Sequence, residues 1–179
     1  MDESLRLEPL GAHHARAAFA CTDEPSLQDY IRDGERAIRE HVNGVTRVYV
    51  LVAASMPNTI IGYVTLSNAT VLAHELPNKV KRGLPLYKLM PAMLLGRMAV
   101  DDNYRGHDYG ALLVLKSFAL CLKAIEIAGC VALLVDPKTD RLISYYANSG
   151  FTSLRDQRRM FIMKTAMEDV LREANFPLE

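Results

Sequence analysis

Apolar residues recur every three or four positions near the start of the chain, which is the spacing of an amphipathic helix. This signal falls within residues 11 to 43 and predicts a helix there. Ser26, directly after Pro25, is the expected N-cap, and Asn43-Gly44 is the expected end. The positions that carry the spacing are Ser26, Leu27, Tyr30, Ile31, Ala37, Ile38 and Val42.

Two stretches rich in β-branched and aromatic residues follow, at 47 to 52 and 60 to 66. Met56-Pro57-Asn58 lies between them and is typical of a turn, so the two stretches should form a β-hairpin. Residues 70 to 91 contain three prolines and a glycine and are expected to form a long connection with a short helix. Connections of this length are often functional.

The second half predicts a strand at 93 to 100, an apolar helix at 111 to 128 ended by Gly129, and a strand at 130 to 135. A helix this apolar should be buried between layers. Strand, helix and strand in this order imply a parallel crossover. A helix at 139 to 147 and one or two strands within 151 to 163 complete the expected fold. Its class is α/β (α+β): a mixed central sheet flanked by helices.

Length and charge place further bounds on the function. The 179 residues are half hydrophobic, which suits a single domain over 1 to 179. The 21 basic and 21 acidic residues cancel, so bulk charge does not draw the chain to nucleic acid or membrane, and a local patch would be needed. The start, Met1-Asp2-Glu3-Ser4, is unlike a secretory signal, and no apolar run is long enough to span a bilayer. We expect a soluble, cytoplasmic protein.

The cysteines and histidines give no metal-binding pattern. Cys21, Cys121 and Cys130 lack metal-ligand spacing and are expected to be reduced and mostly buried. The five histidines form no His-x-x-x-His pair, and no metal is expected.

The most informative segment is the turn between the strand at 93 to 100 and the helix at 111 to 128. Free amides at a helix N-terminus, together with the helix dipole, favour a bound phosphate. The segment contains neither Gly-Lys-Ser/Thr nor G-x-G-x-x-G, so a Walker loop and a dinucleotide fingerprint are excluded. Asp101 and Asp102 are either solvated turn residues or ligands for a substrate amine.

This turn resembles the Arg/Gln-x-x-Gly-x-Gly/Ala signature of the GNAT superfamily of acetyl-coenzyme A-dependent N-acetyltransferases. Arg105 and Gly110 match its first and last positions, and Val135-Asp136-Pro137 and Tyr145-Tyr146-Ala147-Asn148-Ser149-Gly150-Phe151 extend the match. The resemblance implies a GNAT fold with acetyl-CoA as co-substrate. It implies that backbone amides bind the pantetheine and pyrophosphate at Met98, Ala99, Val100, Arg105, Gly106, His107, Asp108, Tyr109, Gly110 and Ala111.

The amino-terminal half is similar to the toxin branch of this superfamily. The match is carried by Phe19-x-Cys21, residues 26 to 31, 48 to 50 and 61 to 67, and Leu84-Pro85-x-Tyr87. The branch acetylates the amine of aminoacyl-tRNA and stalls translation. The resemblance therefore implies aminoacyl-tRNA as acceptor, a small DNA-binding antitoxin as partner, and a homodimer.

Tyr146 is the candidate catalytic side chain. By resemblance it corresponds to the tyrosine that hydrogen-bonds or protonates the leaving sulfur, while Tyr145 aligns with a packing phenylalanine. The alternative is that Tyr146 only packs its helix against the sheet. An α-amino group has a pKa of about 7.7 to 8.0, so the acceptor needs no dedicated base.

Asp108 departs from the family pattern, which has its central glycine there. Its carboxylate either faces the pyrophosphate and weakens coenzyme binding, or turns outward and caps the helix.

Basic residues gather in two stretches. The first lies between Leu76 and Val100 and contains no acidic residue. The second consists of Arg155, Arg158, Arg159 and Lys164, and Asp156 is the one acidic residue beside them. The two stretches form either a solvated surface or a groove for an RNA backbone. The candidate tRNA-binding residues are Lys79, Lys81, Arg82, Lys88, Arg155, Arg158 and Arg159.

Three functions remain open from the sequence. The first is an acetyltransferase for aminoacyl-tRNA. The second keeps the chemistry but uses a small amine or a protein N-terminus as acceptor. The third is a GNAT-like module that binds without catalysis, and it is motivated by Asp108.

Overall fold

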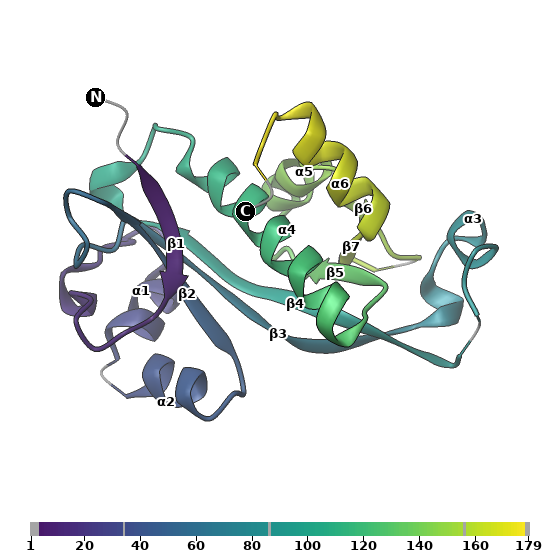
Figure 1. The fold of residues 1–179 in the computed structure, drawn as a ribbon, viewed down its shortest axis with the longest axis horizontal. Coiled ribbons are helices and arrows are strands. Elements are labelled where there is room, and N and C mark those ends of the chain that lie inside the picture. The colour runs from purple at the N-terminus through teal and green to yellow at the C-terminus, as the bar shows by residue number, and fades with distance from the viewer. Residues whose placement is uncertain (1–3, 34, 86, 156, 178–179) are drawn as a thin grey trace. The chain divides into compact units, whose positions relative to one another are not determined.

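A mixed β-sheet carries the fold (Figure 1). The computed structural model describes residues 4–33, 35–85, 87–155 and 157–177. The strand order is β1-β2-β3-β4-β5-β7-β6, in which β4 and β5 are parallel, whereas β1 with β2, β2 with β3, and β7 with both β5 and β6 are antiparallel. The strands are β1 (Leu5–Pro9), β2 (Arg47–Ala53), β3 (Gly62–Leu72), β4 (Leu89–Val100), β5 (Ala132–Val135), β6 (Thr152–Ser153) and β7 (Met160–Met163).

Helices connect the strands. They are α1 (Pro25–Arg32), α2 (Arg36–Val42), α3 (Asn78–Lys81), α4 (Tyr109–Ala128), α5 (Asp140–Asn148) and α6 (Lys164–Glu173), with short 3-10 turns η1 (Arg16–Ala18), η2 (Ala73–Glu75) and η3 (Asp102–Tyr104). The predicted hairpin (β2 and β3) and the predicted parallel crossover (β4, α4 and β5) are both confirmed. The fold class is therefore the one that the sequence predicts. No helix of the described residues is long and apolar enough to cross a membrane.

The chain divides into two compact units. Unit 1 contains Met1–Ser67 and Gly96–Lys116, and unit 2 contains Asn68–Leu95 and Ser117–Glu179. In unit 1, alternate residues of β2 (Val48, Val50 and Val52) are buried against Tyr30 and Ile31 of α1. In unit 2 the buried cluster is Val71, Leu76, Met90, Ala92, Ala132, Leu134, Leu154 and Phe161.

Within unit 1, Gly62 lets β3 pass close to the end of β4. A Cβ at this position would lie 2.9 Å from the carbonyl oxygen of Ala99 and 3.0 Å from Cδ1 of Leu113. Such contacts are shorter than atoms in a packed interior tolerate, so a side chain here would displace β4 or α4.

The helix predicted within residues 11 to 43 is two helices, α1 and α2. The prediction of Ser26 as N-cap is wrong, because Pro25 is the first residue of α1 and Glu24 occupies the cap position. Proline is favoured at the first helical position, where its missing N–H costs no hydrogen bond. The break between the helices starts at Asp33, whose ψ of 109° is not helical. The predicted end at Asn43-Gly44 is confirmed.

The connection between β3 and β4 is shorter than predicted, because β3 continues to Leu72 and β4 begins at Leu89. Pro91 therefore lies inside a strand. It is exposed, and its carbonyl accepts a hydrogen bond from the amide of Val131 at 2.9 Å. The short helix predicted in this connection is present as α3.

The prediction of α4 as a long apolar helix is confirmed, but the expectation that it is buried between layers holds for one face only. One face, including Leu113, Phe118 and Cys121, is buried, whereas Ile127 is 87% exposed. Gly129 ends the helix with a φ of +69°. The three cysteines are free; Cys21 and Cys121 are buried and Cys130 is partly exposed, as predicted.

Candidate functional site

The turn from β4 to α4 leaves backbone amides unpaired at the start of a helix. The carbonyl of Asp108 accepts the amide of Leu112 at 3.1 Å, so Asp108 is the N-cap of α4. Within the described part of the chain, the amides of Asp108, Tyr109, Gly110 and Ala111 have no hydrogen-bond acceptor. These are the free donors of a helix start, and the dipole of a 20-residue helix favours negative charge beside them. The predicted phosphate-binding turn therefore has the geometry that its role requires.

Two residues of this turn have left-handed backbone. Gly106 has a φ of +82° and Asp108 a φ of +56°. The left-handed conformation explains why the family pattern places glycine at the position of Asp108, and aspartate is one of the few other residues that adopt it readily. Both residues are exposed, and a Cβ at Gly106 would meet no atom within 4 Å. The turn is therefore open to solvent at these two residues.

Asp101 is a buried residue that anchors the turn. It is 3% exposed, and its carboxylate accepts hydrogen bonds from the amide of Ala20 at 2.7 Å and from the amide and side-chain nitrogen of Asn103, both at 2.9 Å. The expectation of a solvated residue or an amine ligand is therefore wrong for Asp101. A buried carboxylate needs such donors. The hydrogen bond from Ala20 joins two segments that lie 81 residues apart in the sequence.

Arg105 is held by carboxylates of unit 1. Its guanidinium pairs with Asp23 and, at 2.6 Å, with Asp102. Hydrogen bonds from the amide of Thr22 (2.9 Å) and from its hydroxyl (2.8 Å) lower the pKa of Asp102. Asp102 is thus a structural anchor rather than a free turn residue. Because the Arg105 side chain is already paired, its contribution to phosphate binding would come from its backbone.

His107 lies on the outside of the turn. Its Nδ1 is 3.1 Å from the carbonyl oxygen of Arg105, and its ring stacks on Tyr109 with 5.5 Å between centroids. Met98, Ala99 and Val100 form the end of β4. The parallel register with β5 covers Ala92–Leu95 of β4, so these three residues lie beyond it.

Tyr146 lies on α5, in unit 2. This helix starts where Thr139 accepts the amide of Leu142 at 3.3 Å. The side chain is 8% exposed, and its ring meets those of Tyr145 and Phe151 edge-on at 5.3 and 5.4 Å. Burial, and then the neighbouring Tyr145, raise the pKa of Tyr146 to about 12. Within the described residues its hydroxyl has no hydrogen-bond partner. Tyr146 is therefore a protonated donor at neutral pH.

The seven candidate tRNA-binding residues all belong to unit 2, but they differ in their partners. Arg159 pairs with Asp136 through two hydrogen bonds of 2.6 and 2.7 Å, and Arg158 pairs with Asp140 at 2.8 Å. Both charges are thus partly neutralised. No ion pair forms at Lys79, Lys81, Arg82 or Lys88 among the described residues. Asp156, the acidic residue of the second stretch, lies outside the described part of the chain.

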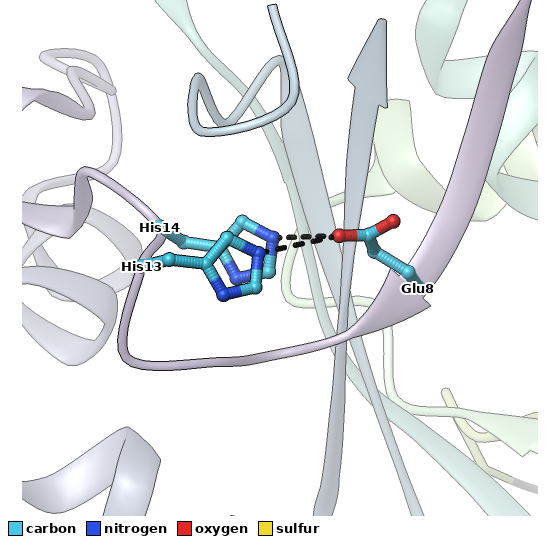
Figure 2. Close-up of side chains that lie close together, drawn as sticks. All are labelled: Glu8, His13 and His14. Carbon is cyan, nitrogen blue, oxygen red and sulfur yellow. Dashed lines mark hydrogen bonds and ion pairs between the residues drawn. The ribbon is translucent and has the colours of Figure 1, made fainter. Parts of the chain in front are cut away.

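Sequence reasoning missed one polar cluster, Glu8, His13 and His14 in unit 1 (Figure 2). Nε2 of His14 lies 3.0 Å from Glu8, and Nε2 of His13 lies 3.5 Å from the same carboxylate oxygen. The amide of Gly11 donates to Nδ1 of His14 at 2.8 Å, so the proton of the neutral ring is on Nε2 and is donated to Glu8. That nitrogen is therefore not a free metal ligand, and the cluster fastens the loop after β1.

The predicted residues therefore fall into two sets. Met98, Ala99, Val100 and the turn from Arg105 to Ala111 lie in unit 1, whereas Tyr146 and the basic residues lie in unit 2. The members of the first set lie on one continuous segment of the chain, residues 98 to 111.

Comparison with known proteins adds independent findings. No family model matches the chain. The chain is 31% identical over 128 residues to the tRNA-acetylating toxin of Mycobacterium tuberculosis, covering 72% of this chain and 73% of the relative. The structure of AtaT complexed with acetyl-methionyl-tRNAfMet is 26% identical, with a TM-score of 0.83 and coverage of 94% of this chain and 99% of that one. The structure of AtaTR bound with AcCoA is also 26% identical, with a TM-score of 0.78 and coverage of 96% and 99%.

Proposed function

Because the chain belongs to the family of tRNA-acetylating toxins, we propose that it transfers the acetyl group of acetyl-CoA to the amine of an aminoacyl-tRNA and so blocks translation. The observation that carries this proposal is the start of α4, where the amides from Asp108 to Ala111 are free to bind a diphosphate. The complexes of AtaT with acetyl-methionyl-tRNAfMet and of AtaTR with AcCoA support the same two substrates.

In the proposed reaction, acetyl-CoA supplies an acetyl group activated as a thioester. The amides at Met98, Ala99 and Val100 bind the pantetheine, and those from Arg105 to Ala111 bind the pyrophosphate. A neutral α-amino nitrogen forms the new bond to the acetyl carbon while the bond from that carbon to sulfur breaks. The amine releases its proton to solvent, the Tyr146 hydroxyl donates a proton to the leaving sulfur, and the resulting phenolate takes a proton back from solvent.

The test uses purified protein, labelled acetyl-CoA and a mixture of charged tRNAs, with uncharged tRNA, small amines and a peptide amine as parallel acceptors. We expect charged tRNA to be labelled far faster than any small amine or the peptide, and the label to be released as N-acetyl amino acid when the ester is hydrolysed. Label confined to small amines or to the peptide would instead establish the second function. No transfer, together with no binding of acetyl-CoA in calorimetry, would establish a non-catalytic module.

The pH dependence of the reaction should show a rising limb and no fall in the neutral range. Initial rates should increase with pH as the acceptor amine loses its proton, and then reach a plateau. Because the pKa of Tyr146 is raised to about 12, its hydroxyl stays protonated through the neutral range. The rate should therefore show no decrease at any pH up to about 10. The profile of kcat/KM for aminoacyl-tRNA measures this. A descending limb centred near pH 8 would contradict the assignment of Tyr146.

Asp108 should weaken the binding of acetyl-CoA without preventing it. Asp108→Gly removes an exposed negative charge beside the proposed pyrophosphate site and suits the φ of +56°. We expect the KM for acetyl-CoA to fall by up to about fivefold, the scale of an exposed charge interaction. Asp108→Asn is the matched control, because asparagine also adopts left-handed backbone but carries no charge. Equal gains in both variants identify the charge as the cause, whereas a gain in the glycine variant alone identifies the backbone.

Three finer features of the proposal come from the resemblance to the toxin branch: a homodimeric form, a small DNA-binding antitoxin as partner, and a cytoplasmic location. The location also follows from the acceptor, since aminoacyl-tRNA is used where translation occurs. The proposed contacts to the tRNA backbone are Lys79, Lys81, Arg82, Lys88, Arg155, Arg158 and Arg159. Five of them, all except Arg158 and Arg159, have no carboxylate partner among the described residues and are the better placed to bind phosphate.

A further inference from the structure

The connection between β3 and β4, described at residues 73 to 85 and at 87 and 88, packs on unit 2 through one apolar face. Leu76, Val80 and Leu84, each four residues apart, turn toward the core cluster of this unit, and Leu76 is fully buried. The amide of Ala73 donates to the carbonyl of Lys88 at 3.2 Å and closes the connection at its base. The apolar face fixes the segment, so its remaining side chains are presented outward.

The outward side chains are cationic. Lys79, Arg82 and Lys88 are exposed and Lys81 is partly exposed, and none of them forms an ion pair among the described residues. The nearest preceding acidic residue, Glu75, accepts hydrogen bonds from Gln157 at 2.5 Å and from the amide of Leu72 at 3.2 Å. The segment therefore offers positive charge that is not already neutralised, which suits a polyanion.

The same segment carries an exposed aromatic residue, Tyr87, directly before Lys88 in the sequence. Tyr87 is 67% exposed, and it is the only aromatic among the exposed large hydrophobic side chains of the described residues. Its amide donates to the carbonyl of Pro85 at 3.2 Å. Exposed aromatic rings between cationic side chains are the means by which proteins bind unpaired nucleotides, because every base has a face on which it can stack.

We infer that Tyr87 is a stacking platform for an unpaired base at the 3′ end of the aminoacyl-tRNA, with Lys79, Lys81, Arg82 and Lys88 binding the adjoining phosphates. This inference rests on the proposed function and adds a substrate-positioning residue to it. The 3′ end of tRNA is single-stranded and carries the aminoacyl group, so its unpaired bases are available to stack on an exposed ring. The cations supply affinity for any RNA backbone, and the ring distinguishes an unpaired end from a duplex.

The test measures two acceptors in parallel: an aminoacyl-tRNA, and the methyl ester of the same amino acid, which has the amine but no RNA. Tyr87→Ala should lower kcat/KM for aminoacyl-tRNA by about ten- to a hundredfold, the scale of one lost base stack. It should leave kcat/KM for the methyl ester within about twofold. Tyr87→Phe keeps the ring and should retain the activity of the unchanged protein. Leu89→Ala, which shortens an exposed aliphatic neighbour, is the control for lost apolar area.

A binding measurement makes the result independent of catalysis. An RNA hairpin with an unpaired 3′ extension should bind the unchanged protein more tightly than the same hairpin with a blunt end, and Tyr87→Ala should abolish the difference. Equal activity of Tyr87→Ala and the unchanged protein on aminoacyl-tRNA would overturn the stacking role while leaving the proposed function intact. Conversion of a dimer to a monomer by Tyr87→Ala would also overturn it, because Tyr87 would then be an interface residue. Failure of the unchanged protein to acetylate aminoacyl-tRNA would instead count against the proposed function.

Discussion

Replacing Tyr146 with phenylalanine should reduce kcat for acetyl transfer by about a hundred- to ten-thousandfold, the range of general acid catalysis. The substitution removes one hydroxyl and keeps the ring, so the edge-on contacts with Tyr145 and Phe151 remain. Without a proton donor the sulfur must leave as a thiolate that only water stabilises. The KM values for both substrates should change by less than about threefold, since the hydroxyl acts as the carbon–sulfur bond breaks. Steady-state kinetics with aminoacyl-tRNA measures both parameters.

Tyr145→Phe is the matched control for this prediction. It removes a phenol one residue away on the same helix and creates the residue that the family pattern has at this position. We expect its kcat to remain within about threefold of that of the unchanged protein. Equal losses in the two variants would show that a phenol here supports the packing of α5 rather than the leaving group. Full activity of Tyr146→Phe would remove the catalytic assignment and leave Tyr146 as a packing residue.

The sequence was sufficient to predict the turn from β4 to α4, because the signals for it are local. A run of strand residues, a glycine-containing turn and a long apolar stretch follow one another, and each is decided by its own neighbours. The same reasoning failed at Asp33, where the apolar spacing continues across a break in the helix. Periodicity shows which face is apolar, but it does not show where the backbone leaves the helix.

The partners of charged residues could not be predicted from the sequence. Arg158 and Arg159 look like free cations in a basic stretch, yet Asp140 and Asp136 neutralise them from a segment some twenty residues earlier. The buried role of Asp101 likewise depends on Ala20, which only the folded chain brings near. One signal was available but unused: Leu76, Val80 and Leu84 recur every four residues through the basic stretch and indicate that one face of it is anchored.

Replacing Asp101 with alanine should lower the free energy of unfolding by about 2–3 kcal/mol, because the amide of Ala20 loses its acceptor. The carboxylate accepts from the amide of Ala20 and from two nitrogens of Asn103 in a buried site. Removing it leaves the amide of Ala20 without its acceptor, at a cost of about 1–3 kcal/mol, whereas the nitrogens of exposed Asn103 can turn to water. Chemical denaturation monitored by circular dichroism measures the change as a shift of the midpoint at constant m-value.

The same substitution should raise the KM for acetyl-CoA by more than about tenfold, measured where the variant is still folded, because Asp101 fixes the turn whose amides bind the pyrophosphate. Asp101→Asn keeps one acceptor oxygen but places an NH₂ group against a donor, so its stability should lie between those of the alanine variant and the unchanged protein. Asp169→Ala is the surface control: its carboxylate is 59% exposed and pairs only with Arg172, so the expected change is below about 1 kcal/mol. If Asp101→Ala lost stability but kept its KM, the anchoring of the turn and the binding of acetyl-CoA would be independent, and the role of the turn would need another explanation.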